Sequence, residues 1–285
     1  MTRLLTVIGH GTNLLPHFIK HYTRYVDEIQ LVVYETEQNP NIGKEVYELT
    51  EDYSNVKIIK IVKDRIYDWN KVTSLYNMFK LKYPNDWWVI ADIDEFHLYP
   101  YDNLQTLIDE CDLNGWDIVR GGFIDRIGRG GDFVEIEAET PLWEQFPNAG
   151  FFRYPMSNAC PNKICLVKGN VKITSGQHYA EFDGHTTWKW QGWNHPLIAP
   201  FHDYSIQVHH FKWDSTVIER IKAVAQIKQD YSFSTEYEKM FKALMKSRYK
   251  IDLLNPDYMF ELGLIYPEYN RYKNWKNLFN KIVTI

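Results

Sequence analysis

The chain has 285 residues, 45% hydrophobic and 24% charged, which is enough to bury a sizeable core in one large α/β domain or in one domain with an appendage. Its formal net charge of −5 argues against broad nucleic-acid binding, which needs a basic face. The three cysteines include no C-x-x-C pair, so the sequence predicts neither a disulfide framework nor a zinc site. Reduced thiols indicate a cytoplasmic location, and no apolar stretch is long enough for a signal peptide or a membrane span.

The N-terminal third of the chain alternates between strand-like and helix-like patterns. Apolar runs typical of buried strands cover residues 4–8, 29–34, 56–62 and 87–91, and helical periodicity covers residues 14–25, 43–53 and 69–82. This order predicts a mostly parallel sheet with right-handed crossovers. In such sheets ligands bind at the carboxyl ends of the strands.

Three carboxylates, Asp92, Asp94 and Glu95, directly follow the fourth apolar run. They repel one another unless a positive charge lies between them. Asp92 and Asp94 are two residues apart, so in an extended chain their side chains point the same way. The pattern predicts a Mn²⁺ or Mg²⁺ ion that is held by oxygen ligands and grips a phosphate-bearing substrate. The alternative is a strand end that simply reaches solvent.

The run D-I-D-E-F after a buried strand resembles the GT-A class of glycosyltransferases, and within it the family 2-type and family 92-like groups. The resemblance covers roughly residues 3–215. It implies a GT-A (Rossmann-like), mostly parallel mixed sheet flanked by helices in residues 1–213, with a helical C-terminal extension in residues 214–285. It also implies a hexosyltransferase that moves a sugar from a nucleotide-diphosphate donor, with UDP-sugars favoured, to a glycan or other hydroxyl acceptor.

A third metal ligand is implied by the run His209-His210-Phe211-Lys212, which resembles a His-Tyr run of the related enzymes. Alternation along a strand puts His209 and His210 on opposite faces, so one of them is expected at the metal. The resemblance favours His210, alongside Asp92 and Asp94. A histidine in the core is the alternative.

Donor-binding residues are implied at the strand ends and on the helix before the acidic motif. The expected set is His10, Glu35, Lys71, Asn77, Asp92, Arg126 and Lys212. Several of these have a structural alternative: Lys71 on a solvated helix face, Asn77 packed against the sheet, and Arg126 in an ion pair with Asp125. His178, which follows a late strand, is expected to face the active site.

Sugar transfer builds negative charge on the leaving diphosphate, which a bound divalent cation stabilises as a Lewis acid. An inverting enzyme also needs a carboxylate base within hydrogen-bond reach of the acceptor hydroxyl. The candidate bases are Asp125, Glu181 and Asp183. Glu95 is expected to orient these groups or to contact the acceptor.

Three other classes of protein would place different demands on the sequence. A metal-dependent nucleotidyltransferase would want a basic, Gly-rich loop after the first strand, and residues 9–13 offer two glycines without Lys or Arg. A non-catalytic carbohydrate-binding protein would bind sugar without metal-dependent nucleotide binding. In haloacid dehalogenase-type phosphatases the D-x-D motif follows the first strand, whereas here it follows the fourth.

The C-terminal part changes character. Helical spacing of apolar residues over 217–227 and 237–245 predicts helices that pack on one side of the sheet domain or form a cap. The segment 271–285 is basic and aromatic, which fits a docking helix or a peripheral contact with a membrane surface near a lipid-linked acceptor.

Overall fold

The computed structural model describes residues 1–150, 160, 162–182, 185–186, 195–204, 206–226 and 234–252. The chain divides into two compact units. The first comprises Met1–Gly122 and Asn162–Val208, and the second comprises Phe123–Pro161 and His209–Ile285. The predicted domain boundary after residue 213 stays a prediction.

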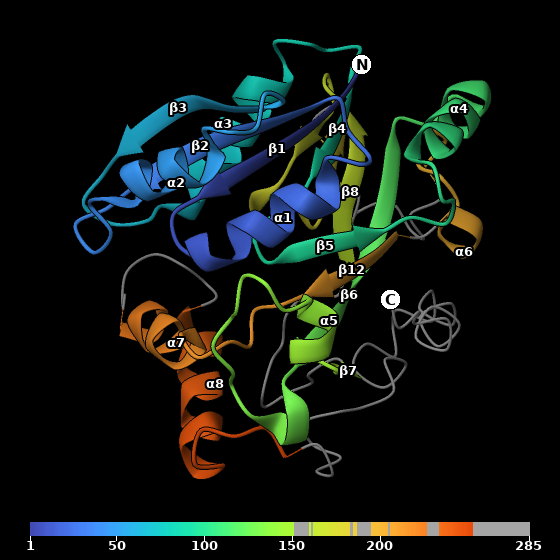
Figure 1. The fold of residues 1–285 in the computed structure, drawn as a ribbon. Helices are drawn as coiled ribbons and strands as arrows, with labels where there is room; N and C mark the ends of the chain where they lie inside the picture. The colour runs from blue at the N-terminus through green and yellow to red at the C-terminus, as the bar shows by residue number, and fades with distance from the viewer. Residues whose placement is uncertain are drawn as a thin grey trace. The chain divides into compact units, whose positions relative to one another are not determined.

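The first unit contains the alternating strands and helices that the sequence predicts (Figure 1). Its elements are β1 (Thr2–Ile8), η1 (Thr12–Leu14), α1 (Leu15–Tyr22), β2 (Glu28–Glu35), α2 (Ile42–Thr50), β3 (Val56–Lys63), α3 (Trp69–Lys80), β4 (Trp87–Ile90), β5 (Glu95–Leu98), α4 (Leu104–Asn114), β8 (Asn162–Lys168), β9 (Lys172–Ile173), η3 (Ser175–Gln177), β10 (Ala180–Phe182), β11 (His185–Thr186) and α6 (Phe201–Tyr204). Two strands, β6 (Ile118–Ile127) and β12 (Ile206–His210), begin in this unit.

The main sheet has the order β3-β2-β1-β4-β8-β6-β12-β5, with β7 (Asn148–Gly150) paired to β6. Strands β1, β2, β3 and β4 pair in parallel. Strand β8 is antiparallel to both β4 and β6, and β7 is antiparallel to β6. The predicted α/β class, with a mixed sheet flanked by helices, is confirmed; the parallel part is the N-terminal half of the sheet.

Buried side chains explain the apolar strands of the first unit. Leu5 and Val7 of β1 belong to the same core cluster as Trp88 and Ile90 of β4 and as Tyr76 of α3. A parallel strand that is covered on both faces reads as a continuous apolar run. Helix α3 begins at its N-cap Asp68, whose carboxylate accepts hydrogen bonds from the first-turn amides of Asn70 and Lys71.

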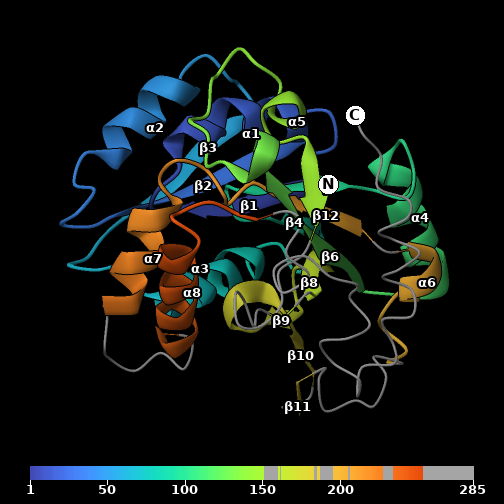
Figure 2. The same ribbon diagram turned by 90° about the horizontal axis from the view of Figure 1, so that it is seen from below.

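The second unit holds the rest of β6 and β12, β7, η2 (Arg129–Gly131), α5 (Leu142–Gln145), α7 (Val217–Gln226) and α8 (Ser234–Lys246). Helices α7 and α8 lie side by side (Figure 2). They share a core with Ile127, Trp213 and Ile251, which confirms the predicted C-terminal helices. The segment 271–285 lies outside the described residues.

Asp125 and Arg126 lie inside β6, because Asp125–Ile127 pair with Asn148–Gly150. In the turn that follows, Gly131 has φ +87°, and a Cβ there would collide with the carbonyl oxygen of Ile251. This glycine is therefore required by backbone packing.

Candidate functional site

The carboxyl ends of β1, β3 and β4 come together in the first unit. A Cβ on Gly9 would lie 2.4 Å from the Tyr67 ring. A Cβ on Gly11, which has φ +73°, would lie 3.2 Å from the Ile93 side chain. The carbonyl of Gly9 accepts a hydrogen bond from the Asn39 amide at 2.9 Å. The turn after β1 therefore packs directly between the loop after β3 and the acidic motif.

The acidic motif forms a closed turn. The backbone N–H of Glu95 donates to the carbonyl of Asp92 at 2.9 Å. In return, the N–H of Asp92 donates to Oε2 of Glu95 at 3.3 Å. Asp94, at the third position of this turn, is 8% exposed, whereas the Asp92 side chain is 37% exposed.

The positive charge among these carboxylates is an ammonium group. Nζ of Lys163 lies 3.0 Å from Oδ2 of Asp92 and 2.7 Å from Oε1 of Glu95. Strand β8 pairs Leu166 with Val89 of β4, and continuing this antiparallel register by three residues places Lys163 opposite Asp92. In the sequence, Lys163 stands at the start of a short apolar run, and nothing there indicates this register.

Charge and burial act against each other at Lys163. Burial by itself would lower the pKa of Lys163, but the carboxylates of Asp92 and Glu95 outweigh burial and raise it above its usual value. The ammonium is therefore charged at all physiological pH values. Glu95 is 2% exposed and both of its oxygens are engaged, so its position suits orienting Asp92 and Lys163 rather than contacting an acceptor.

His178 lies close enough to this cluster for the charges of Lys163 and Asp92 to act on it. Its Nδ1 is 2.7 Å from the carbonyl of Asn162, so Nδ1 carries the proton in that bond. Burial, and then the charge of Lys163, lower the pKa of His178 to about 4. The imidazole is therefore neutral at pH 7.

Two tyrosines border the acidic turn. The hydroxyl of Tyr76 donates to Oδ1 of Asp92 at 3.0 Å. Burial raises the pKa of Tyr67 well above its usual value, and the charges of Asp92, Tyr34 and Asp94 add to this effect. Tyr67 thus connects the acidic turn with Gly9. Sequence patterns gave no indication of either tyrosine.

Lys71 belongs to a neighbouring polar cluster. Its Nζ lies 2.6 Å from Oδ2 of Asp64, which also accepts from the Tyr34 hydroxyl at 2.5 Å. These bonds from Lys71 and Tyr34 hold the pKa of Asp64 below its usual value. Lys71 is therefore ion-paired with Asp64, and this bond directs it to Asp64 rather than to the acidic turn.

The other predicted donor contacts of the first unit take different positions. Glu35 is 9% exposed and pairs with Lys63 at 2.8 Å. His10 lies in the turn after β1, with its ring 6.3 Å from that of Tyr67. Asn77 donates to the carbonyl of Ile173 at 2.8 Å and accepts from its N–H at 2.9 Å. Its amide thus holds β9 and corresponds to the structural alternative.

The acidic turn carries oxygen ligands of the type that a divalent cation uses. Both oxygens of Asp92 already accept hydrogen bonds, one from Tyr76 and one from Lys163. Among the described residues there is no group of three or more His, Cys, Asp or Glu side chains that could hold a metal ion. A Mg²⁺-type ion commonly uses one or two carboxylates and completes its shell with water and substrate phosphates. Asp92 and Asp94 are carboxylates, the type of ligand that such an ion uses.

In the second unit, Asp125 accepts from two aromatic partners. Its Oδ1 lies 2.9 Å from Nδ1 of His210 and 3.0 Å from Nε1 of Trp213. His209 is fully buried, with its ring edge-on to Trp143 at 4.7 Å, so the two adjacent histidines do have different surroundings. The metal role of His210 and the base role of Asp125 stay predictions.

Arg126 and Lys212 are engaged within the second unit. Arg126 is 1% exposed, donates from Nε to the carbonyl of Phe146 and stacks over Trp143. Burial lowers the pKa of Arg126 to about 10. Nζ of Lys212 donates to the Tyr237 hydroxyl at 3.2 Å. Both cations thus bond to groups of the second unit itself: Arg126 to the carbonyl of Phe146, and Lys212 to the Tyr237 hydroxyl.

Of the remaining candidate bases, Glu181 on β10 pairs with Lys172 of β9 at 3.0 Å. Asp183 lies outside the described residues.

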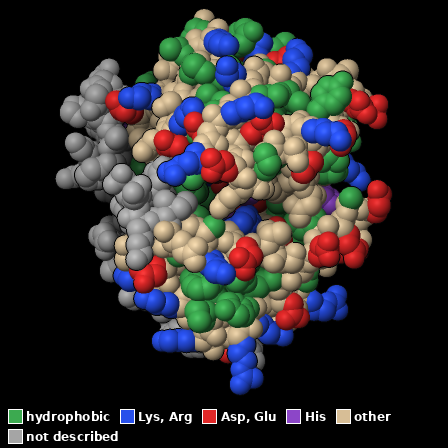
Figure 3. All heavy atoms as spheres, turned by 90° about the vertical axis from the view of Figure 1, so that its left-hand side faces the viewer, with side chains coloured by type: hydrophobic (Ala, Val, Ile, Leu, Met, Phe, Trp, Pro, Cys, Tyr) green, Lys and Arg blue, Asp and Glu red, His purple; other side chains and the backbone are tan. Residues whose placement is uncertain are grey.

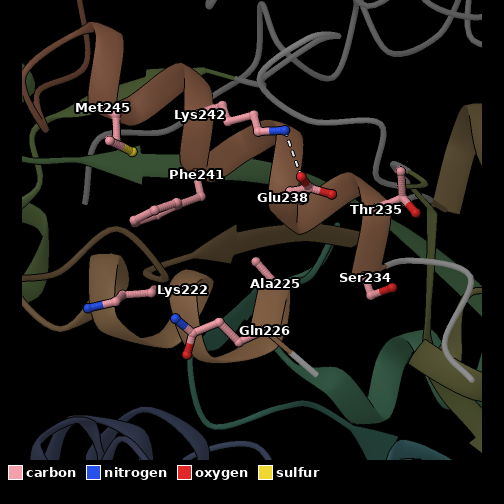
Figure 4. Close-up of a pocket in the computed structure, with 9 residues that line it drawn as sticks. All are labelled: Lys222, Ala225, Gln226, Ser234, Thr235, Glu238, Phe241, Lys242 and Met245. Atoms are coloured by element: carbon pink, nitrogen blue, oxygen red, sulfur yellow. Dashed lines mark hydrogen bonds and ion pairs between the residues drawn. The ribbon is translucent and has the colours of Figure 1, made fainter. Parts of the chain in front are cut away.

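A separate cavity of about 610 Å³ lies between α7 and α8 (Figure 4). Its lining consists of Lys222, Ala225, Gln226, Ser234, Thr235, Glu238, Phe241, Lys242 and Met245. Lys242 and Glu238 pair along α8 at 2.6 Å, an arrangement that is common on exposed helix faces. On the face shown in Figure 3, basic and acidic side chains of the described residues are interspersed.

No family model matches the chain, and no curated protein matches it. A solved structure of a protein from Bacillus anthracis, named as a candidate glucose-1-phosphate thymidylyltransferase and complexed with a sucrose, is similar with a TM-score of 0.38 and 9% identity. The match covers 84% of this chain and 99% of that one. A likeness at this level does not assign an activity. None of the helices in the described residues is long and apolar enough to span a bilayer.

Proposed function

We propose that the protein is a metal-dependent glycosyltransferase of the GT-A class that uses a nucleotide-diphosphate sugar, with a UDP-sugar favoured. The observation that carries the proposal is the acidic turn Asp92–Glu95, packed at the carboxyl ends of parallel strands against the glycine turn after β1. That edge of a parallel sheet is where nucleotides bind in open α/β folds. Because positions 9 and 11 are glycines, the turn has no bulky side chain at either position, and its backbone can approach Tyr67 and Ile93 closely.

In this proposal Asp94 holds a Mn²⁺ or Mg²⁺ ion, and Asp92, fixed by Tyr76 and Lys163, contacts the ribose or a metal-bound water. The ion, when bound, stabilises the negative charge that develops on the leaving diphosphate. Lys163 and Glu95 keep the turn closed, so that Asp92 and Asp94 retain their positions during transfer. His210 remains the predicted third ligand, and Asp125 and Glu181 remain predicted bases.

The test is calorimetric titration of UDP and of GDP into the protein, with Mn²⁺ and then with EDTA. We expect one nucleotide to bind in a metal-dependent manner, and Asp94→Ala to weaken that binding by about tenfold or more, as loss of a charged ligand does. Asp52→Ala, which removes an exposed carboxylate of the same unit, is the matched control.

Product analysis distinguishes the nucleotidyltransferase alternative. A glycosyltransferase releases a nucleoside diphosphate from a nucleotide sugar. A nucleotidyltransferase instead joins a sugar phosphate to a nucleoside triphosphate, which forms a nucleotide sugar and releases pyrophosphate from the triphosphate. Release of pyrophosphate alone, or no nucleotide binding under any metal condition, contradicts the proposal. The second result moves the non-catalytic carbohydrate-binding class ahead.

A further inference from the structure

We propose that Lys163 is a resident counterion of the acidic turn, and that it makes binding of a divalent cation at Asp94 depend on the diphosphate of the donor. This inference rests on the proposed function for the identity of the diphosphate. It concerns how the site acquires its metal.

Each of the four carboxylate oxygens of Asp92 and Glu95 already has a bonding partner within the protein. Lys163 takes one oxygen of each residue, at 3.0 and 2.7 Å. The Tyr76 hydroxyl takes the second oxygen of Asp92, and the backbone N–H of Asp92 takes the second oxygen of Glu95. Two of the three carboxylates in the motif are thus held from within the protein.

The buried charge of Lys163 opposes the entry of a free cation. An ammonium group that is only 3% exposed is poorly screened by water, so it repels a second cation entering the same turn. The Lys163 ammonium, 3.0 Å from Oδ2 of Asp92 and 2.7 Å from Oε1 of Glu95, neutralises part of the negative charge that would otherwise attract a free ion. A diphosphate supplies new negative charge and new oxygen ligands, and so restores the attraction.

The position of Lys163 is fixed by the backbone of β8. Lys163 is anchored by β8, whose register to β4 fixes the start of the strand beside the acidic turn. Because Lys163 and Glu95 are both nearly fully buried, the ammonium cannot swing into solvent when a cation arrives. The protein therefore keeps this charge in place, and metal and nucleotide are expected to bind cooperatively.

The experiment is titration of MnCl₂ alone, followed by MnCl₂ with saturating UDP or GDP, into wild type, Glu95→Gln and Lys163→Met/Glu95→Gln. The double variant removes one positive and one negative charge, so it leaves no unpaired buried carboxylate at position 95. Glu95→Gln is its matched control, because it keeps the ammonium. Circular dichroism confirms that each variant is folded.

For Mn²⁺ alone we expect weak binding to wild type and to Glu95→Gln, and binding that is about tenfold or more tighter in the double variant. The gain that nucleotide gives to Mn²⁺ affinity should be correspondingly smaller in the double variant, since coupling between two ligands is reciprocal. Lys60→Met, which removes an exposed lysine, should behave as wild type.

Equal Mn²⁺ affinity in the double variant and in Glu95→Gln overturns the inference, as does tight Mn²⁺ binding to wild type without nucleotide. Failure of the proposed function is a different result, namely that no nucleotide binds to wild type with or without metal. The titration of Mn²⁺ alone still decides whether Lys163 opposes cation binding in that case.

Discussion

Nζ of Lys163 lies 2.7 Å from Oε1 of Glu95, with the two side chains 3% and 2% exposed. Breaking a buried ion pair by removing one partner leaves an uncompensated charge, which typically costs about 3–5 kcal/mol. We therefore expect Lys163→Met to lower the free energy of unfolding by about that amount in urea titrations. Lys163→Met/Glu95→Gln should recover a large part of the loss.

The matched control for this prediction is Lys172→Met, which removes a lysine from the exposed pair with Glu181. Such pairs contribute about 0–1 kcal/mol. If Lys163→Met costs no more than Lys172→Met, the buried pair has no special role in stability.

His21 provides a prediction about acid stability. Its Nε2 donates to the carbonyl of His97 at 2.9 Å, and its Nδ1 lies 3.3 Å from a guanidinium nitrogen of Arg24, so both bonds suit the neutral ring. Burial, and then the charge of Arg24, lower the pKa of His21 to about 3. In the unfolded chain His21 has a pKa of about 6.5. Its contribution to folding stability is therefore fully present above that pH and is lost as pH falls toward 3.

The slope from this one group is at most about 1.4 kcal/mol per pH unit. We expect His21→Gln, whose amide can make both bonds without titrating, to flatten the pH dependence of unfolding between pH 6 and about 4. Lys20→Gln, on the exposed side of the same helix, should leave the slope as in wild type. An unchanged slope in His21→Gln means that other groups control acid unfolding.

Asn77 is predicted to be a stability residue. Its amide makes two hydrogen bonds to the backbone of Ile173, and each buried group left without a partner costs about 1–3 kcal/mol. Asn77→Ala should therefore destabilise the protein by roughly 2 kcal/mol or more in thermal or urea unfolding. Nucleotide affinity, measured by calorimetry at a temperature where the variant is folded, should change less than about threefold. A selective loss of nucleotide binding would instead restore the donor role implied by the resemblance.

Gly9 tests the packing of the turn after β1. A Cβ at this position would lie 2.4 and 2.6 Å from two carbons of the Tyr67 ring, so Gly9→Ala must displace the ring. We expect a loss of about 1–3 kcal/mol in unfolding free energy, together with weaker nucleotide binding. Gly9→Ala/Tyr67→Val removes the collision, and its unfolding free energy should then be close to that of Tyr67→Val alone. Additive losses in the double variant would show that Tyr67 is not the obstacle.

The sequence by itself determined strands β1 to β4, helices α1 to α3 and the place of the acidic motif. Continuous apolar runs at β1, β2 and β4 and helical periodicity at α7 and α8 are local signals, because burial of each element imposes its own spacing. Asp92, Asp94 and Glu95 follow β4 in the chain, and a parallel sheet brings strand ends to one edge whatever the remaining contacts are.

Only the tertiary structure decided which partners these residues have. Lys163 stands 68 positions beyond Glu95 in the printed sequence, and its place beside the acidic turn depends on the antiparallel register between β4 and β8. The same holds for Asn77, which is bonded to Ile173, and for Asp125, which lies in β6 and accepts from His210. A register is set by the packing of whole strands, and a shift of one residue would send the side chains of Lys163 in β8 and Asp125 in β6 to the opposite face.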